Sequence, residues 1–380
     1  MKRIIGMGLV WVLLLGLLPM QAAAAEIPAK SAVLMDVATG TVLFEQNPHE
    51  KLAPASVTKV MTMLLIMEAI DSHRIRWEDA VAASETAAAK GGSQVYLKVG
   101  ETMTVTEMLK AIAVSSANDC ACAMAEHIAG SEEAFVAMMN ARAAELGMQD
   151  TQFVNCTGLD DSPEAANHRT SAYDIALMSR QLLKFHPEIK KFTTIWMDTL
   201  RNGTFGLSNT NKLVRFYSGA TGLKTGFTSG AGYCLSASAQ RDGMELIAVV
   251  MGSETSKDRF NGCRLLLDRG FAGWTVVTPA LQGELTVPVK LGKAKSVEVV
   301  PATADAILLE KGLKGTVTTD IELEETVDAP VSTGQRLGTL TVRAGEQVLA
   351  KIPLVAKAPV EKLGYWDIVV MLVKKVVMVK

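Results

Sequence analysis

Cysteine and net charge are both scarce in this 380-residue chain. Its 5 cysteines are odd in number and too sparse for a disulfide scaffold, so they are interpreted as small buried apolar residues, with room for a single disulfide. The 38 Lys and Arg residues nearly balance 40 Asp and Glu, which leaves a formal charge of −2. The chain therefore lacks the excess of positive charge that is typical of proteins that bind nucleic acid.

Residues 1–25 are predicted to be a signal peptide that is not part of the fold. Two basic residues precede an apolar run over 4–18, and small residues over 19–25 fit cleavage just before Glu26. A retained N-terminal anchor helix is the alternative, but the run is shorter than the roughly 20 residues that a membrane span requires. We therefore expect the mature protein to be exported.

A buried helix with a serine and a lysine in its first turn is predicted to start at Pro54. The run Val60 to Ile70 has no Gly or Pro and is rich in Met and Leu, as in helices that are buried on most faces. Ser56 and Lys59 are three residues apart and so lie on one side of the helix. A lysine whose pKa is lowered by burial or by a second cation can act as a base toward the serine. By itself this spacing is a weak signal, because an N-capping serine beside a solvated lysine gives the same pattern.

The sequence around this helix alternates between strand and helix patterns. A β-hairpin is predicted over 30–44, and helices over 106–114 and 120–128 follow an extended segment at 95–99. The segment 115–119, Ser-Ser-Ala-Asn-Asp, is interpreted as a short loop between the two helices, or as an N-cap of the second. Ser, Asn and Asp favour such positions because their side chains compete for backbone groups in helix interiors.

Farther along, the patterns indicate helices over 131–147 and 171–185, a turn over 155–161, and strands over 233–239 and 245–251 that are joined at Arg241-Asp-Gly243. Lys224-Thr-Gly226 is expected on, or at the end of, the antiparallel strand before this hairpin. A glycine there lets a ligand approach the edge of the strand closely.

Three short motifs occur in the order and structural contexts of the penicillin-recognising serine enzymes. They are Ser56-x-x-Lys59 opening a helix, Ser116-Ala-Asn118 between helices, and Lys224-Thr-Gly226 before a hairpin. The flanking residues resemble most closely those of the D-alanyl-D-alanine carboxypeptidases, the low-molecular-weight penicillin-binding proteins. The resembling stretches are 36–43, 54–62, 116–119, 146–148, 155–160 and 221–228, within a resemblance that covers about residues 28–275.

This resemblance implies an α+β fold: a serine β-lactamase/transpeptidase-like domain with an antiparallel five-stranded sheet and helices, followed by a small all-β domain. We expect a signal peptide over 1–25, a catalytic domain over 26–278, a C-terminal β-domain over 279–358 and an amphipathic membrane anchor over 359–380. Short alternating runs at 285–291, 296–300, 314–323, 338–342 and 348–354 predict the strands of the β-domain. A spacer or protein-contact role is expected for that domain.

The resemblance also implies a role for each motif residue. Ser56 would attack the carbonyl of the D-Ala-D-Ala bond, neutral Lys59 would accept its proton, and water would release the acyl-enzyme. Ser116 would pass a proton to the leaving amine. Asn118 would orient Lys59 and the substrate amide.

Residues of the third motif and one arginine are expected to bind substrate. Lys224 would be the second cation that lowers the pKa of Lys59, and with Thr225 it would hold the terminal carboxylate. Gly226 would allow close approach, and the backbone N–H groups of Ser56 and Phe227 would form the oxyanion hole. Phe227 stands where some relatives carry His. Arg259 aligns with a carboxylate-binding arginine of the family, although a solvated surface charge fits equally well.

The expected partners are peptidoglycan stem peptides, and β-lactams as covalent inhibitors, with no cofactor, metal or nucleic acid. A class A β-lactamase shares the motifs, but no Glu-x-x-Leu-Asn lies between Ser116 and Lys224. A zinc carboxypeptidase is weaker still, because His49-Glu50 is not followed by the second His of His-Glu-x-x-His. A related protein that binds substrate without catalysis would be expected to have lost a motif residue, and all motif residues are present here.

The segment 362–380 is predicted to lie on a membrane surface as an amphipathic helix. Asp367, Met371, Lys374, Lys375 and Met378 would share one stripe, and almost everything else is apolar. The two adjacent lysines interrupt any spanning segment. A β-strand or core element is the competing interpretation, because valine favours strands. We expect a peripheral enzyme at the outer face of the cytoplasmic membrane or in the cell wall.

Overall fold

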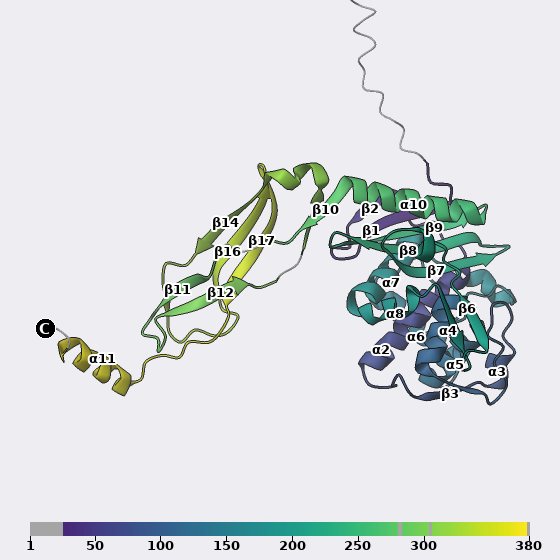
Figure 1. Ribbon diagram of the computed structural model, residues 1–380, viewed down its shortest axis with the longest axis horizontal. Helices are drawn as coiled ribbons and strands as arrows, with labels where there is room; N and C mark the ends of the chain where they lie inside the picture. The colour runs from purple at the N-terminus through teal and green to yellow at the C-terminus, as the bar shows by residue number, and fades with distance from the viewer. Residues whose placement is uncertain (1–25, 280–282, 304–305, 378–380) are drawn as a thin grey trace, which may run out of the picture.

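The computed structural model describes residues 26–279, 283–303 and 306–377, so the predicted signal peptide 1–25 lies outside the described residues. Figure 1 shows two lobes: a larger one of helices on a sheet, and a smaller one built from strands. The smaller lobe follows the larger in the chain and ends in a separate helix.

A five-stranded antiparallel sheet forms the middle of the larger lobe, in the order β2-β1-β9-β8-β7. The strands are β1 (Ser31–Asp36), β2 (Val42–Gln46), β7 (Ala220–Thr228), β8 (Gly232–Arg241) and β9 (Met244–Ser253). The chain thus begins the sheet with the hairpin β1–β2 and completes it with β7, β8 and β9, which agrees with the five-stranded sheet that the family resemblance implied.

Helices cover both faces of this sheet because its central strands are apolar on both sides. In β1, Val33 and Met35 face one core and Ala32 and Leu34 face the other, following the two-residue alternation of a strand. The helix α10 (Ser256–Gly273) covers the second face together with Leu213 of the short α9 (Leu213–Phe216). The helices that lie on the first face are α2 (Lys59–Asp71), α4 (Val105–Ser115), α5 (Asn118–Ala129), α6 (Glu132–Glu145) and α7 (Ala172–Phe185) (Figure 1).

The first face carries α2, of which all residues but Glu68 and Asp71 are buried. This confirms a helix that is buried on most of its faces. The elements of the lobe not yet named are α3 (Glu85–Ala88), α8 (Lys190–Thr193), the 3-10 helices η2 (Ala55–Thr58), η3 (Pro163–Asn167) and η4 (Pro187–Ile189), and the short pairs β3 (Ala80–Ala82) with β4 (Thr102–Thr104) and β5 (Met197–Leu200) with β6 (Phe205–Ser208).

The smaller lobe is a six-stranded sheet in the order β14-β16-β17-β12-β11-β15. Its strands are β11 (Leu285–Lys290), β12 (Ser296–Pro301), β14 (Val317–Leu323), β15 (Val327–Asp328), β16 (Arg336–Ala344) and β17 (Gln347–Ala356). A valine- and leucine-rich core lies within it. The pair β10 (Trp274–Val277) and β13 (Ile307–Glu310) lies where the two lobes meet, and η5 (Lys311–Thr316) follows β13.

The final described element is a helix, α11 (Tyr365–Val377), so the competing prediction of a β-strand in this segment is wrong. Its Tyr365 and Trp366 are each 75% exposed, and the apolar side chains of 370–373 are also exposed. Among the described residues, no helix combines the length and apolar character that a membrane crossing would require.

Candidate active site

Ser56 lies in η2, one turn before the α-helix that was predicted to contain it. The prediction of an α-helix starting at Pro54 is wrong at this end, because Ala55 has a φ of 49° and the next residues form a 3-10 turn. The spacing nevertheless brings the two side chains together: Nζ of Lys59 lies 2.9 Å from Oγ of Ser56. Ser56 is partly exposed, whereas Lys59 behind it is fully buried.

Burial sets the proton affinity of Lys59. It lowers the pKa of this lysine from 10.5 to about 7, against the opposing influence of Cys156 and Asp119. Lys59 can therefore be neutral near neutral pH. Desolvation is the main cause of this shift. The pKa of Lys224 is depressed by burial and then by Lys59 and Arg259, and the repulsion between the two lysines acts on both.

A backbone carbonyl gives the Lys59 amine a second partner, since Nζ donates to the carbonyl oxygen of Thr157 at 2.8 Å. Asn155 fixes this turn, its Oδ1 accepting from the N–H groups of Thr157 at 3.2 Å and Gly158 at 2.7 Å. Gly158 has a φ of 80°, and a Cβ there would lie 1.8 Å from the carbonyl oxygen of Ala55. A neutral amine has two N–H groups and one lone pair, so a carbonyl acceptor helps to turn the lone pair toward the serine hydroxyl.

Ser116 and Asn118 lie where α4 meets α5. The connection is shorter than the predicted loop 115–119, because Asn118 and Asp119 already belong to α5. Ser116 ends α4 in a left-handed conformation with φ 66°, which turns the chain sharply. Oγ of Ser116 and Oδ1 of Asn118 are buried without a hydrogen-bond partner among the described residues. Buried polar groups of this kind are rare and fit a site that awaits a ligand.

The segment before β4 holds this corner in place. Asn118 donates from Nδ2 to the carbonyl of Gly91 and from its backbone N–H to the carbonyl of Ser93, both at 2.7 Å. Asp119 accepts from the N–H of Val95 at 3.1 Å. The amide of Asn118 is therefore fixed through its nitrogen, which leaves its oxygen free to accept a hydrogen bond.

Lys224, Thr225 and Gly226 lie on the edge strand β7, as predicted. A Cβ at Gly226 would lie 2.5 Å from the carbonyl oxygen of Pro54 and 3.1 Å from the backbone nitrogen of Ser56. The prediction attributed this glycine to the approach of a ligand. The structure adds a different reason, because the backbone of η2 itself packs against the strand at this point.

Arg259 lies on α10, beside β7, and is only 8% exposed, so the alternative of a solvated surface charge is wrong. Its Nη1 donates to the carbonyl of Gly226 at 2.9 Å, and its Nε has no partner among the described residues. The guanidinium lies 5.2 Å from the ring centre of Tyr233, and that ring stacks on Phe227 with 4.3 Å between centroids. Phe227, near the end of β7, is 53% exposed.

His168 is a buried residue of this region that the sequence analysis did not identify. Its Nδ1 accepts from the N–H of Val154 at 3.1 Å, so Nε2 carries the proton and donates to Oγ1 of Thr58 at 2.8 Å. Thr58 in turn donates to the carbonyl of Ala55 at 2.8 Å. Burial lowers the pKa of His168 to about 4, which keeps the ring neutral and suits a structural support of η2. No short motif signals it, because His168 and Thr58 are 110 residues apart in the chain.

Comparison with known families decides what this arrangement is. A family model described as D-alanyl-D-alanine carboxypeptidase matches residues 19–255, and one described as penicillin-binding protein 5, C-terminal domain, matches residues 276–362. The chain belongs to the D-alanyl-D-alanine carboxypeptidase family. The resemblance drawn from the three motifs is thus confirmed, and the α+β fold class with it.

Individual members of this carboxypeptidase family are similar over most of the chain. D-alanyl-D-alanine carboxypeptidase DacF of Bacillus subtilis is 46% identical over 343 residues, covering 89% of this chain and 87% of DacF. The crystal structure of penicillin-binding protein 5 from Haemophilus influenzae has a TM-score of 0.73 at 31% identity, covering 89% of this chain and 98% of its own. The ampicillin-bound penicillin-binding protein D2 from Listeria monocytogenes has a TM-score of 0.59 at 31% identity, covering 65% of this chain and 99% of its own.

Proposed function

We propose that this member of the serine D-alanyl-D-alanine carboxypeptidases removes the terminal D-alanine of peptidoglycan stem peptides through an acyl-enzyme on Ser56. Neutral Lys59 takes the proton of the Ser56 hydroxyl as the oxygen attacks the carbonyl carbon. The D-alanine amine leaves with a proton delivered through Ser116. Water then hydrolyses the ester and regenerates the serine.

The observation that carries this proposal is the pairing of Ser56 with a fully buried lysine whose Nζ lies 2.9 Å from its Oγ. Burial lowers the pKa of Lys59 to about 7, so the amine can accept a proton at neutral pH. A solvated lysine would hold its proton and could not serve as a base. The alternative of an N-capping serine beside a solvated lysine therefore loses its support.

The substrate carboxylate has three candidate partners, on β7 and α10: Lys224, Thr225 and Arg259. Lys224 and Arg259 are buried basic residues, and burial lowers the pKa of Lys224 well below its usual value. An incoming carboxylate would favour the protonated form of this lysine and raise its pKa again. The backbone N–H groups of Ser56 and Phe227 are proposed to bind the developing oxyanion, with about 3–4 kcal/mol expected per donor.

A β-lactamase remains the second candidate, because penicillin would acylate the same serine. The absence of Glu-x-x-Leu-Asn between Ser116 and Lys224 argues against rapid release of that acyl-enzyme. Membership in the carboxypeptidase family argues in the same direction. We therefore propose that β-lactams act as covalent inhibitors.

Labelling with a fluorescent penicillin tests the nucleophile. The intact protein should carry one label, located at Ser56 by mass mapping, and should release D-alanine from peptides ending in D-Ala-D-Ala. Ser56→Ala should lose both activities while remaining folded by circular dichroism. Labelling that persists in the folded variant, or rapid penicillin turnover without D-alanine release, would contradict the proposal.

We also propose export by residues 1–25 and peripheral attachment of the mature enzyme to the outer face of the cytoplasmic membrane. Support for attachment comes from α11, whose Tyr365 and Trp366 are exposed together with apolar side chains of 370–373. The division into a catalytic domain over 26–278, a β-domain over 279–358 and an anchor over 359–380 forms part of this proposal. In it, the β-domain acts as a spacer between the membrane and the catalytic domain.

A further inference from the structure

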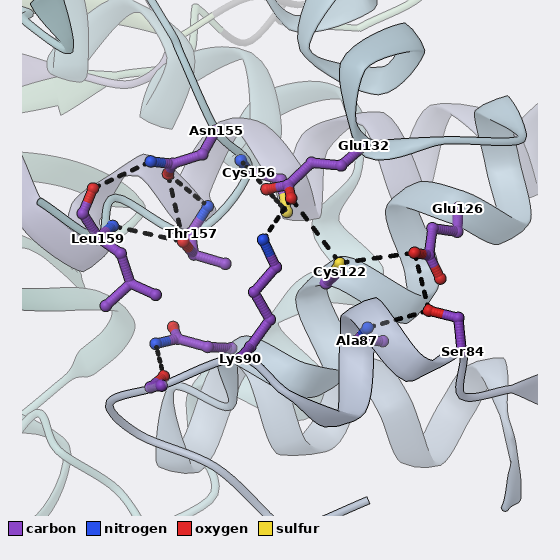
Figure 2. A network of polar contacts seen from close by, with 12 residues as sticks. Ser84, Ala87, Lys90, Cys122, Glu126, Glu132, Asn155, Cys156, Thr157 and Leu159 are labelled. Atoms are coloured by element: carbon purple, nitrogen blue, oxygen red, sulfur yellow. Dashed lines mark hydrogen bonds and ion pairs between the residues drawn. The ribbon is translucent and has the colours of Figure 1, made fainter. Parts of the chain in front are cut away.

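Glu132, the first residue of α6, lies at the centre of a buried polar network next to the proposed active site. Its side chain is only 13% exposed and forms an ion pair with Nζ of Lys90 at 2.5 Å. It also accepts from the backbone N–H of Cys156 at 3.1 Å and from Sγ of Cys156 at 3.2 Å. Figure 2 shows Lys90 and Cys156 meeting at this carboxylate from two different segments.

Through Cys156, the carboxylate holds the turn that orients Lys59. The carbonyl of Cys156 accepts from Oγ1 of Thr62 at 2.6 Å, and the next carbonyl, that of Thr157, accepts from Nζ of Lys59 at 2.8 Å. The turn is thus fixed on one side by Glu132 and on the other by two residues of α2. A shift of the turn away from α2 would remove the acceptor that orients the lysine amine.

Through Lys90, the same carboxylate reaches the other side of the site. Lys90 directly precedes Gly91, whose carbonyl accepts from Nδ2 of Asn118 at 2.7 Å. The ion pair between Lys90 and Glu132 therefore joins the two segments that position Lys59 and Asn118. These segments are distant in sequence, and the ion pair connects them together with the hydrogen bonds from Cys156 to Glu132.

We propose that Glu132 is a positioning residue for acylation: paired with Lys90, it holds the Thr157 carbonyl against Lys59 and the Gly91 carbonyl against Asn118. This inference rests on the proposed acylation of Ser56 by way of Lys59. Neither Glu132 nor Lys90 is assigned contact with substrate. Their effect is to keep two backbone carbonyls at hydrogen-bond distance from the groups that act.

The protonation states in the network fit this role. Burial opposes charge on Glu132, but the hydrogen bond and charge of Lys90 hold its pKa below the usual range. The pKa of the Cys156 thiol is raised well above its usual value by the nearby Cys122 thiol, by burial and by Glu132. The thiol therefore stays protonated and donates. Beyond Cys122, Glu126 of α5 continues the network to Ser84, the N-cap of α3 (Figure 2).

Removing both charges of the ion pair between Lys90 and Glu132 leaves the net charge of the protein unchanged. A change in acylation then reports on the position of the two backbone carbonyls and not on a change in net charge. In the double variant Lys90→Gln with Glu132→Gln, we expect the rate of penicillin acylation per active site to fall about tenfold at its high-pH limit. The loss of the Thr157 acceptor destabilises protonated Lys59, so the midpoint of the pH profile should also move to lower pH. The charged and titratable groups facing Lys59, namely Asp119, Cys156, Lys224 and His168, are unchanged in this variant.

The matched control removes an exposed ion pair of the same types, Glu188 with Lys191. The double variant Glu188→Gln with Lys191→Gln should keep both the rate and the midpoint of the intact protein. Rates are normalised to the number of titratable sites, so partial unfolding does not lower them. If the Lys90 and Glu132 variant lowers the rate with an unchanged midpoint, or changes neither, positioning by Glu132 is wrong.

Should the double variant fold too poorly to titrate, Glu132→Gln alone decides the question, because the amide keeps the size of the side chain. It should show the same decreases in rate and midpoint, and here the rate at the high-pH limit is decisive, because the unpaired charge of Lys90 also lowers the midpoint. Glu133→Gln, a change at the exposed neighbour on α6, should show neither. The proposed function fails separately, if Ser56→Ala is still labelled or the unmodified protein releases no D-alanine.

Discussion

At the scale of single residues, the protonation of Lys59 should set the pH dependence of acylation. Burial lowers its pKa from 10.5 to about 7, and only the neutral amine can accept the serine proton. The acylation rate should therefore rise as pH increases through about 7 and level off above it. Below the midpoint it should fall about tenfold per pH unit, because the neutral fraction does.

The measurement is the rate of penicillin labelling between pH 5 and pH 9. A rate that stays level over this whole range would show that Lys59 is not the titrating base. A rate that still rises about tenfold per pH unit at pH 9 would show instead that the amine is solvated, with the ordinary lysine pKa. The same shift affects stability: protonation of this lysine favours the unfolded state, so stability should decrease as pH falls from about 10.5 to about 7.

Sequence alone predicted the residues of the proposed site whose side chains belong to short motifs. Ser56 and Lys59 could be paired because three residues along a helical turn bring side chains together. Thr157 could not be identified as a partner of Lys59, because it accepts the hydrogen bond of the lysine amine through its backbone carbonyl, a group that every residue has. Glu132 was missed for another reason: its partners Lys90 and Cys156 lie 42 and 24 residues away in the chain, at distances fixed only by the fold.

At the scale of elements, the contact between β7 and η2 should depend on the absence of a side chain at Gly226. In Gly226→Ala, the new Cβ would lie 2.5 Å from the carbonyl oxygen of Pro54, so the strand and the serine turn must separate. We expect a loss of about 1–3 kcal/mol in the free energy of unfolding, as for other overpacked sites. Penicillin acylation should slow about tenfold or more, because Ser56 moves relative to β7.

Gly206→Ala is the matched control, because Gly206 also lies in a strand and a Cβ there meets nothing within 4 Å. Urea unfolding and labelling rates should be close to those of the intact protein in this control. Equal stability and labelling in Gly226→Ala and the intact protein would show that η2 does not rest on the strand as described.

Elements with long or strongly periodic patterns were predictable, and short ones were not. The hairpin over 30–44, the buried helix after Lys59 and the strands around Arg241-Asp-Gly243 all form. The pairs β3 with β4 and β5 with β6 were missed because strands of three or four residues are too short to show a pattern. The predicted extended segment at 95–99 belongs to no strand, and Tyr96 within it has a φ of 59°.

At the scale of the whole molecule, the two lobes and α11 separate the proposed chemistry from the proposed membrane contact. The motif residues all lie in the larger lobe, whereas the exposed apolar helix lies at the far end of the chain (Figure 1). The predicted order of a helix-and-sheet lobe followed by a strand-rich lobe is confirmed. Its exact boundaries and the role of the second lobe stay predictions.

Apolar contact through α11 should dominate membrane attachment. Trp366 is 75% exposed, and burying a large apolar side chain contributes about 1.5–3 kcal/mol. Trp366→Asp should therefore weaken binding to phospholipid vesicles. Phe185→Asp is the matched control, because Phe185 is 54% exposed but lies on the larger lobe. It should bind vesicles as the intact protein does.

Deleting residues 362–380 should release the mature enzyme from membranes while leaving its release of D-alanine from small peptides nearly unchanged, because no motif residue lies there. Several apolar side chains at about 1.5–3 kcal/mol each exceed what the few lysines of this segment contribute, at about 1 kcal/mol each. Sedimentation with membranes should accordingly resist high salt and yield to detergent. If salt alone removes the full-length mature protein, attachment is electrostatic. If the shortened protein still sediments with membranes, attachment lies elsewhere in the molecule.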